Sequence, residues 1–256
     1  MKNLSASISS FGERTRLLSD FVKNPKQANA AFFIVRSKFD RSHRGKGFFH
    51  GMPFFFRAKD VSGVREVLRD KEYSFLDSYL ASKTNPVIAD IGAHIGTFSL
   101  YCFSKNPGTR ILSVEASPST YALLNDTVSQ QNQKTWTVIH RAAWKDGESV
   151  SFSDAGDAMS HKVDANGTLR VEGISLSSIL EKTGAIDIAK IDIEGAEEVF
   201  LFNTPEALDR ISTLVIELHP DRINEKAVRD LLNSKFTQVK DIQGRISSKP
   251  LLLCTR

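Results

Sequence analysis

From Pro86 onward, hydrophobic positions fall into short runs rich in β-branched residues, and segments with helical spacing separate the runs. This alternation predicts βαβ units, and therefore an α/β fold with a parallel sheet between helices. A helix over residues 227–236 and two strand-like segments, 236–242 and 250–256, close the chain and predict an antiparallel edge. The five central strands are predicted at Val87–Gly92, Arg110–Ala116, Trp136–Ala143, Asp187–Glu194 and Thr213–His219.

The first third of the chain has a less regular pattern. Apolar residues between Phe11 and Val22 have helical spacing, residues 48–56 predict two extended pieces around a Gly-Met-Pro turn, and Val64–Leu80 predicts a helix. We therefore divide the chain into a helical, Phe-rich extension (1–84) and a main domain (85–256). The extension is interpreted as a lid, an acceptor-side segment or an oligomer surface, although aromatic residues at such spacing are more often core. A polar stretch over 154–167 is interpreted as a functional loop.

Composition narrows the class of protein. The chain has 256 residues, 41% of them hydrophobic and 25% charged, as in ordinary globular proteins. Its apolar runs are too short to cross a bilayer and its start lacks a signal-like apolar stretch, which predicts a cytoplasmic protein. A net charge of +4 spread along the chain indicates no nucleic-acid partner, and the two distant cysteines indicate no disulfide or zinc site.

Residues 90–96, DIGAHIG, lie between an apolar strand and an apolar helix, where a cofactor loop is expected. Gly92 allows a sharp turn, Ala93 allows close approach of a ligand, and Gly96 allows the helix start to pack tightly. A dinucleotide fingerprint would have its middle glycine at His94. We interpret His94 as a turn residue, with direct contact to a ligand as the second interpretation.

Three strand ends carry acids. Glu115 follows Gly96 by roughly 20 residues, where an acid accepts the ribose hydroxyls of an adenosine; the alternative is a cap on the next helix. Asp192 and Glu194 end the fourth strand, and Glu217 and His219 end the fifth. The carboxyl ends of parallel strands face one crevice, so we expect these side chains to converge. Glu197 and Glu198 are attributed to the dipole of the following helix.

The motifs DIGAHIG, VEASP, KIDIEGAE and IELHP, in this order over residues 85–220, resemble the FkbM-type S-adenosylmethionine-dependent methyltransferases. The resemblance implies a Rossmann-like class I methyltransferase fold with a mostly parallel seven-stranded sheet, and O-methylation of sugars, glycans or secondary metabolites. It places the loop at the methionine part of S-adenosylmethionine, Glu115 at the ribose and Ala142 and Ala143 near the adenine. The implied cofactor-binding set is Asp90, Gly92, Ala93, His94, Gly96, Glu115, Ala116, Ala142 and Ala143.

Two positions depart from the family pattern: His94 replaces a frequent Asn, and Ser177 replaces an acid. The predicted catalytic residues are Asp192, Glu217 and His219. Methyl transfer is an in-line displacement, and a hydroxyl acceptor must lose its proton, so His219 is the candidate general base and Asp192 its partner or the group that orients the acceptor. An alternative, to which we do not commit, has all three residues binding a divalent metal.

Other classes compete with this interpretation. An NAD-dependent oxidoreductase would share Glu115 but requires G-x-G-x-x-G. A nucleic-acid base methyltransferase requires an aromatic motif after the fourth strand, which is absent from Asp192–Gly195. A non-catalytic module that binds the cofactor is the third alternative. The predicted partner is a small-molecule or glycan acceptor, whose identity the sequence does not reveal.

Overall fold

The main body of the protein is a seven-stranded sheet with the order β11-β12-β10-β9-β3-β4-β5. The computed structural model describes residues 40–152, 169–242 and 248–256. Five neighbouring strands are parallel and β12 is antiparallel to both of its neighbours, β10 and β11. The predicted mostly parallel sheet with an antiparallel edge is thereby confirmed. The strands are β3 (Val87–Ile91), β4 (Arg110–Glu115), β5 (Trp136–His140), β9 (Ile186–Ile191), β10 (Ile211–Glu217), β11 (Gln238–Asp241) and β12 (Leu251–Thr255).

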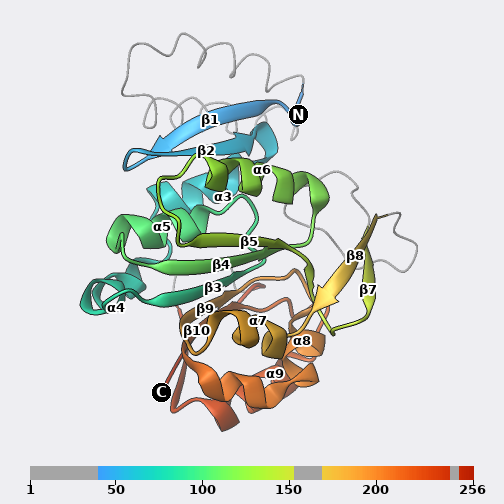
Figure 1. Cartoon of the computed structure of the whole chain (residues 1–256). Helices are drawn as coiled ribbons and strands as arrows, with labels where there is room; N and C mark the ends of the chain where they lie inside the picture. The colour runs from blue at the N-terminus through green and yellow to red at the C-terminus, as the bar shows by residue number, and fades with distance from the viewer. Residues whose placement is uncertain (1–39, 153–168, 243–247) are drawn as a thin grey trace, which may run out of the picture.

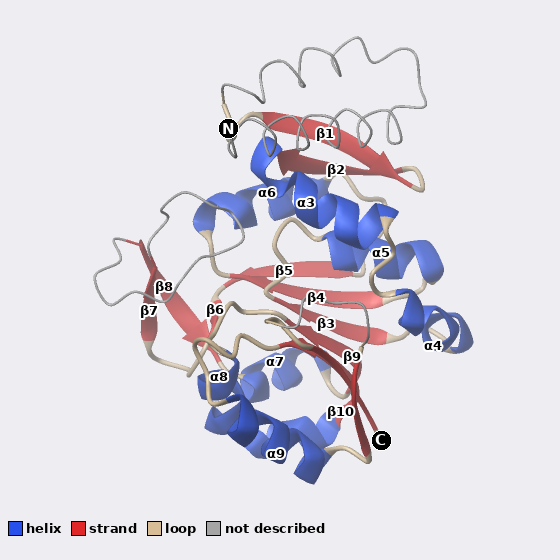
Figure 2. Ribbon diagram, turned by 180° about the vertical axis from the view of Figure 1, so that it is seen from behind, coloured by secondary structure: helices blue, strands red, loops and turns tan. Residues whose placement is uncertain are grey.

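The chain reverses its direction across the sheet at β3. It proceeds outward through β4 and β5, returns, and then continues on the other side of β3 through β9 and β10. Such a reversal opens a crevice at the carboxyl ends of the two central strands, here β3 and β9. In Figures 1 and 2, α5 and α6 cover one face of the sheet and α7, α8 and α9 cover the other. These helices are α5 (Thr97–Lys105), α6 (Pro118–Ser129), α7 (Leu176–Thr183), α8 (Glu197–Asn203) and α9 (Glu225–Lys235).

Alternate residues of each central strand contribute to two hydrophobic cores, one on each face. Ile88 and Ile188 belong to the core beneath α5 and α6, whereas Ala89 and Ala189 belong to the core beneath α7, α8 and α9. This follows from the two-residue period of a strand. Because both faces are covered, the strands are apolar almost throughout, which is the pattern that identified them in the sequence.

The extension begins, within the described residues, with a hairpin of β1 (Arg44–Phe49) and β2 (Met52–Arg57). The two extended pieces are confirmed. The turn lies at His50 and Gly51, with φ of 47° and 81°, so it begins one residue before the expected Gly-Met-Pro and includes its glycine. Two-residue hairpin turns favour positive φ because their twist then matches that of the strands. The apolar pattern of residues 11–22 and the polar stretch 154–167 lie outside the described residues.

The helix predicted over Val64–Leu80 is broken into four short elements. The chain leaves helical geometry at Lys71, whose φ is 55°. The hydrophobic spacing therefore continues across a break that periodicity alone does not reveal. The elements are α3 (Val61–Val64), the π-helical turn η2 (Arg65–Arg69), the 3₁₀ turn η3 (Ser74–Leu76) and α4 (Asp77–Ser82).

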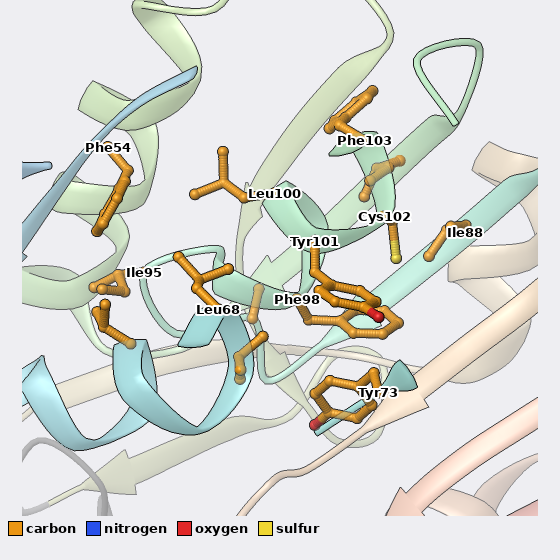
Figure 3. Packing of buried hydrophobic residues seen from close by; sticks show 14 of the residues in the cluster. Phe54, Leu68, Tyr73, Ile88, Ile95, Phe98, Leu100, Tyr101, Cys102 and Phe103 are labelled. Carbon is orange, nitrogen blue, oxygen red and sulfur yellow. The ribbon is translucent and has the colours of Figure 1, made fainter. Parts of the chain in front are cut away.

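The described part of the extension shares a core with the main domain. Phe54 from β2, Leu68 from η2 and Tyr73 pack in one cluster with Ile95 and Phe98 of the loop and helix that follow β3, as Figure 3 shows. The buried guanidinium of Arg57 donates from Nη2 to Thr120 Oγ1 of α6 over 2.9 Å. The boundary between residues 84 and 85 stays a prediction.

The third predicted strand, Trp136–Ala143, is two strands. β5 ends at His140, and β6 (Ala142–Ala143) pairs with β8 (Leu169–Ile174) in a small sheet completed by β7 (Ser149–Phe152). The chain thus turns out of the main sheet at its carboxyl edge and carries both alanines with it. No helix in the described part of the chain has the length and apolar character needed to span a membrane.

Gly92 provides a test of how closely β3 and β9 approach. A Cβ atom at Gly92 would lie 1.8 Å from the backbone oxygen of Asp192, and φ is 76°. At Gly147 φ is 74°, but a Cβ would meet nothing within 4 Å. Gly147→Ala is therefore expected to cost about 1 kcal/mol from backbone strain, and Gly92→Ala at least ~3 kcal/mol, measured by urea unfolding. Equal costs would show that the close approach is unimportant for stability.

Candidate active site

A cavity of about 330 Å³ opens at the carboxyl ends of the central strands. It brings together most of the residues predicted to form the site, although they are spread over more than 120 positions of the sequence. Three of them lie elsewhere: Asp90, Gly96 and His219 are not part of the lining. The predicted residues that do line the cavity are Gly92, Ala93, His94, Glu115, Ala116, Ala142, Ala143, Asp192 and Glu217.

The loop after β3 is fixed to both neighbouring strands. The backbone N–H groups of Gly92 and Ala93 both donate to Val114 O of β4, over 3.0 and 2.9 Å. On the other side, the backbone oxygen of Asp192 occupies the space that a side chain at Gly92 would need. Only glycine fits here, because the φ is positive and the approach is too close for a Cβ. The loop is therefore held rigidly at the cavity wall.

Glu115 is buried and its carboxylate is oriented by two backbone donors. Oε2 accepts the N–H of His94 and Oε1 accepts the N–H of Ser117, each over 2.8 Å. An ionised carboxylate has about four lone-pair sites, so both oxygens retain acceptor capacity toward the cavity. The bond to Ser117, at the start of α6, also agrees with the alternative interpretation as a helix cap. The two interpretations are compatible in this geometry.

His94 has the left-handed backbone expected of a turn residue, with φ of 53°. Its Nε2 lies 3.2 Å from Asp60 Oδ1, at ion-pair distance but without the geometry of a hydrogen bond. Burial alone would raise the pKa of Asp60, but His94 and Arg57 outweigh this effect and hold the pKa well below its usual range. The side chain thus connects the cofactor loop to the extension while it also lines the cavity.

Asp90 and Gly96 support the loop from behind. Asp90 is fully buried, its Oδ2 accepts the hydroxyl of Ser99 over 2.6 Å, and burial raises its pKa. It therefore joins β3 to α5 and does not reach the cavity. Gly96 has φ of 85°, and a Cβ there would lie 2.7 Å from Leu124 and 2.8 Å from Trp136. Its role is to let the start of α5 pack against α6 and β5.

Lys190 is a site residue that the sequence interpretation missed. Its Nζ donates to Gly92 O over 2.8 Å and lies 3.6 Å from Asp192 Oδ2. Burial lowers the pKa of a lysine, but Asp192 and Asp90 outweigh this effect and raise it, so Lys190 is a cation. The available signal was a lysine in an otherwise apolar predicted strand, because a buried charge requires a partner.

His219 has a different environment from the one expected of a general base. It is fully buried, Nδ1 lies 2.9 Å from Glu197 Oε1, and Nε2 lies 3.3 Å from Glu194 Oε2. Burial lowers the pKa of a histidine, but these two carboxylates outweigh it and raise the pKa to about 10. An imidazolium at neutral pH cannot accept a proton, so this geometry favours a positioning role. Glu197, which the sequence analysis attributed to the helix dipole, thus also pairs with His219.

A second cation, Lys249, reaches the strand ends from the segment before β12. Its Nζ lies 3.3 Å from Glu194 Oε1 and 3.7 Å from Glu217 Oε1. Sequence patterns do not indicate this contact, because residue 249 joins the site only through the C-terminal strands. Donor atoms of Asp192, Glu194 and His219 lie within 4.8 Å of one another, a spacing open to a metal ion, but Lys249 and Arg222 already place positive charge at Glu194.

This combination of fold and site defines a class. A parallel sheet with a reversal at β3, a Gly-rich loop at the crevice, and an oriented acid at the end of the next strand form a Rossmann-like enzyme fold for an adenosine-containing cofactor. The model of the methyltransferase FkbM domain matches residues 90–242, more than half of the sequence. The chain belongs to the FkbM methyltransferase family.

Known proteins give three further comparisons. A hexuronic acid methyltransferase, AglP, of Haloferax volcanii is 25% identical over 183 residues, which are 70% of this chain and 71% of that protein. Precorrin-6y C5,15-methyltransferase of Geobacter metallireducens has a TM-score of 0.41 at 14% identity, covering 70% of this chain and 86% of that one. TrmK of M. capricolum, solved with S-adenosylhomocysteine, has a TM-score of 0.42 at 14% identity, covering 70% and 66%.

The charge on His219 predicts a pH dependence of stability. Because the folded pKa is about 10 and the ordinary value is 6.5, the contribution is complete below pH 6.5 and is lost as pH rises toward 10. The stability advantage of wild type over His219→Gln should therefore fall by on the order of 3 kcal/mol over this range. Urea unfolding of both proteins at several pH values measures it. Parallel pH profiles would show that His219 is neutral in the folded state.

Proposed function

We propose that the protein transfers a methyl group from S-adenosylmethionine to a hydroxyl of a sugar, glycan or secondary metabolite. The observation that carries the proposal is one cavity that joins the Gly92 loop and Glu115 to Asp192 and Glu217 at the neighbouring strand ends. A cofactor bound at the loop and an acceptor bound at these acids would meet inside it. Membership of the FkbM family supports methyl transfer as the reaction.

The lining residues fit such a cofactor. Gly92 and Ala93 leave room for its methionine part, and Glu115 offers oriented acceptors for the ribose hydroxyls. Ala116, Ala142 and Ala143 are small residues beside Glu115 on the adenine side, where Trp144 adds an aromatic surface. S-adenosylmethionine, when bound, supplies an electrophilic methyl group on a positively charged sulfur. The acids along the cavity favour that charge.

We assign Asp192 as the group that accepts the proton of the acceptor hydroxyl. It is partly exposed to the cavity, at the end of β9, and Lys190 lies close to its carboxylate. An acceptor hydroxyl that donates to Asp192 is oriented, and its oxygen becomes more nucleophilic as the methyl group approaches. Glu217, also in the lining, would bind a second hydroxyl. His219 then acts through Glu194 and Glu197 rather than on the acceptor.

Two observations favour a polyhydroxylated acceptor. The carboxylates of Asp192, Glu194 and Glu217 all border the cavity, and carboxylates are strong acceptors for hydroxyl groups. The relative from Haloferax volcanii is named for a sugar acid. We therefore infer that the acceptor contains a sugar.

Three alternatives remain distinguishable. An NAD-dependent oxidoreductase would bind NAD in preference to S-adenosylhomocysteine. A cofactor-binding module without catalysis would bind the cofactor but never transfer a methyl group. A divalent metal held by Asp192, His219 and either Glu194 or Glu217 would make activity sensitive to chelators. Each alternative predicts a different result in the two experiments below.

The first experiment concerns the cofactor. Wild type should bind S-adenosylhomocysteine by calorimetry, and NAD not measurably. Glu115→Gln loses a charged acceptor for the ribose and should raise the Kd at least about tenfold. Glu181→Gln, at an exposed position of α7 outside the cavity lining, is the matched control and should bind normally. Normal binding by Glu115→Gln would show that Glu115 does not hold the ribose.

The second experiment concerns the transfer step. Wild type incubated with S-adenosylmethionine and a panel of sugars and hydroxylated metabolites should yield a product heavier by one methylene group, detected by mass spectrometry. With that acceptor, Asp192→Asn should lower kcat about 100-fold or more, and leave the Kd of S-adenosylhomocysteine within about threefold. Activity that persists after chelation supports the metal-free mechanism. An unchanged kcat would exclude Asp192 as the proton acceptor.

A further inference from the structure

The extension supplies one wall of the cavity. Gly63 and Val67, together with Glu66 between them, line it from α3 and η2, and Tyr73 lines it from the segment that follows. Gly63, Glu66 and Val67 are spaced three and four residues apart, which places them on one side of a helical turn. In the loop after β3 and the start of α5, the lining residues are Gly92, Ala93, His94, Thr97 and Phe98.

This wall is fixed to the loop by contacts at both of its ends. Asp60, just before α3, lies 3.2 Å from His94 Nε2. At the other end, the rings of Tyr73 and Phe98 meet edge to face with centroids 4.7 Å apart, a contact visible in Figure 3. Leu68 of η2, which lies between Asp60 and Tyr73 in the sequence, is buried. The turn that carries Glu66 is therefore held beside the loop.

The turn that carries Glu66 has π-helical geometry. The N–H of Asp70 donates over 2.8 Å to the carbonyl oxygen of Arg65, five residues earlier, whereas the donor and acceptor in an α-helix are four residues apart. Such turns are rare and frequently occur at functional sites, because they redirect the side chains of one turn. This geometry, at a turn that borders the cavity, is an observation separate from the charge of Glu66.

Glu66 also differs in its surroundings from Glu115, Asp192 and Glu194, which line the same cavity. Glu115 accepts two backbone N–H groups, Asp192 lies beside Lys190, and Glu194 lies beside Lys249. Glu66 is partly buried, yet within the part of the chain that the structure describes no donor or cation contacts its carboxylate. A partly desolvated carboxylate without a partner is unfavourable, and a positively charged ligand group would relieve this cost.

We propose that Glu66 binds the α-ammonium group of the methionine part of S-adenosylmethionine. This inference rests on the proposed function. The ammonium group is at the end of the cofactor remote from the ribose, and Glu66 lines the same cavity as the loop assigned to the methionine part. Asp90, the acid at the start of that loop, is sequestered against Ser99 and does not reach the cavity. The extension thereby completes the cofactor site.

The test uses two adenosine ligands and Glu66→Gln. S-adenosylhomocysteine carries the ammonium group, whereas 5′-methylthioadenosine lacks the whole amino-acid part. The variant should raise the Kd of S-adenosylhomocysteine about 10- to 100-fold, the range for a charge-assisted hydrogen bond, and leave the Kd of 5′-methylthioadenosine unchanged. Glu181→Gln, an exposed position on α7, is the matched control for loss of one negative charge.

The outcomes separate this assignment from the proposed function. If Glu66→Gln weakens both ligands equally, its effect is on the shape of the cavity and the assignment is overturned. Unchanged binding of S-adenosylhomocysteine overturns it as well. Binding of 5′-methylthioadenosine by the variant at the wild-type affinity shows that the variant is folded. Wild type that binds neither ligand contradicts the proposed function itself, and the assignment with it.

Discussion

The buried ammonium group of Lys190 ties together the parts on which the site depends. It donates to Gly92 O in the loop after β3 and lies beside Asp192 at the end of its own strand, β9. Gly92 in turn has no space for a side chain, because the backbone of Asp192 fills it. Removing an ammonium group from water costs several kcal/mol unless it is paired, so this contact fixes the loop and the acid relative to each other.

A second set of charges is compensated at the end of β10. Glu194, Glu197 and Glu217 surround His219, and Lys249 adds a cation from the C-terminal segment. The carboxylates of Glu194 and Glu197 outweigh the effect of burial and raise the pKa of the imidazole. The acids that border the cavity are thus paired with cations, Lys190 and Lys249, which also line it.

The described part of the N-terminal extension, residues 40–84, packs against the main domain. Its residues share a hydrophobic core with α5, and its Arg57–Asp60 pair reaches both His94 and α6. It also forms one wall of the cavity. The contacts that bury the Phe-rich segment therefore also shape the site. Most of the aromatic residues of the described part are packed in the core or against it, as their spacing indicated.

The sequence by itself determined the α/β class, the succession of the central strands along the chain and the convergence of Gly92, Glu115 and Asp192, because apolar periodicity and strand-end position are local properties. It did not indicate that Asp90 faces α5, that His219 is an imidazolium, or that Lys249 and Glu66 reach the same region. Side-chain direction, burial and charge pairing depend on segments distant in the sequence. Only the tertiary structure decided them, because a pKa and a contact are properties of the packed chain.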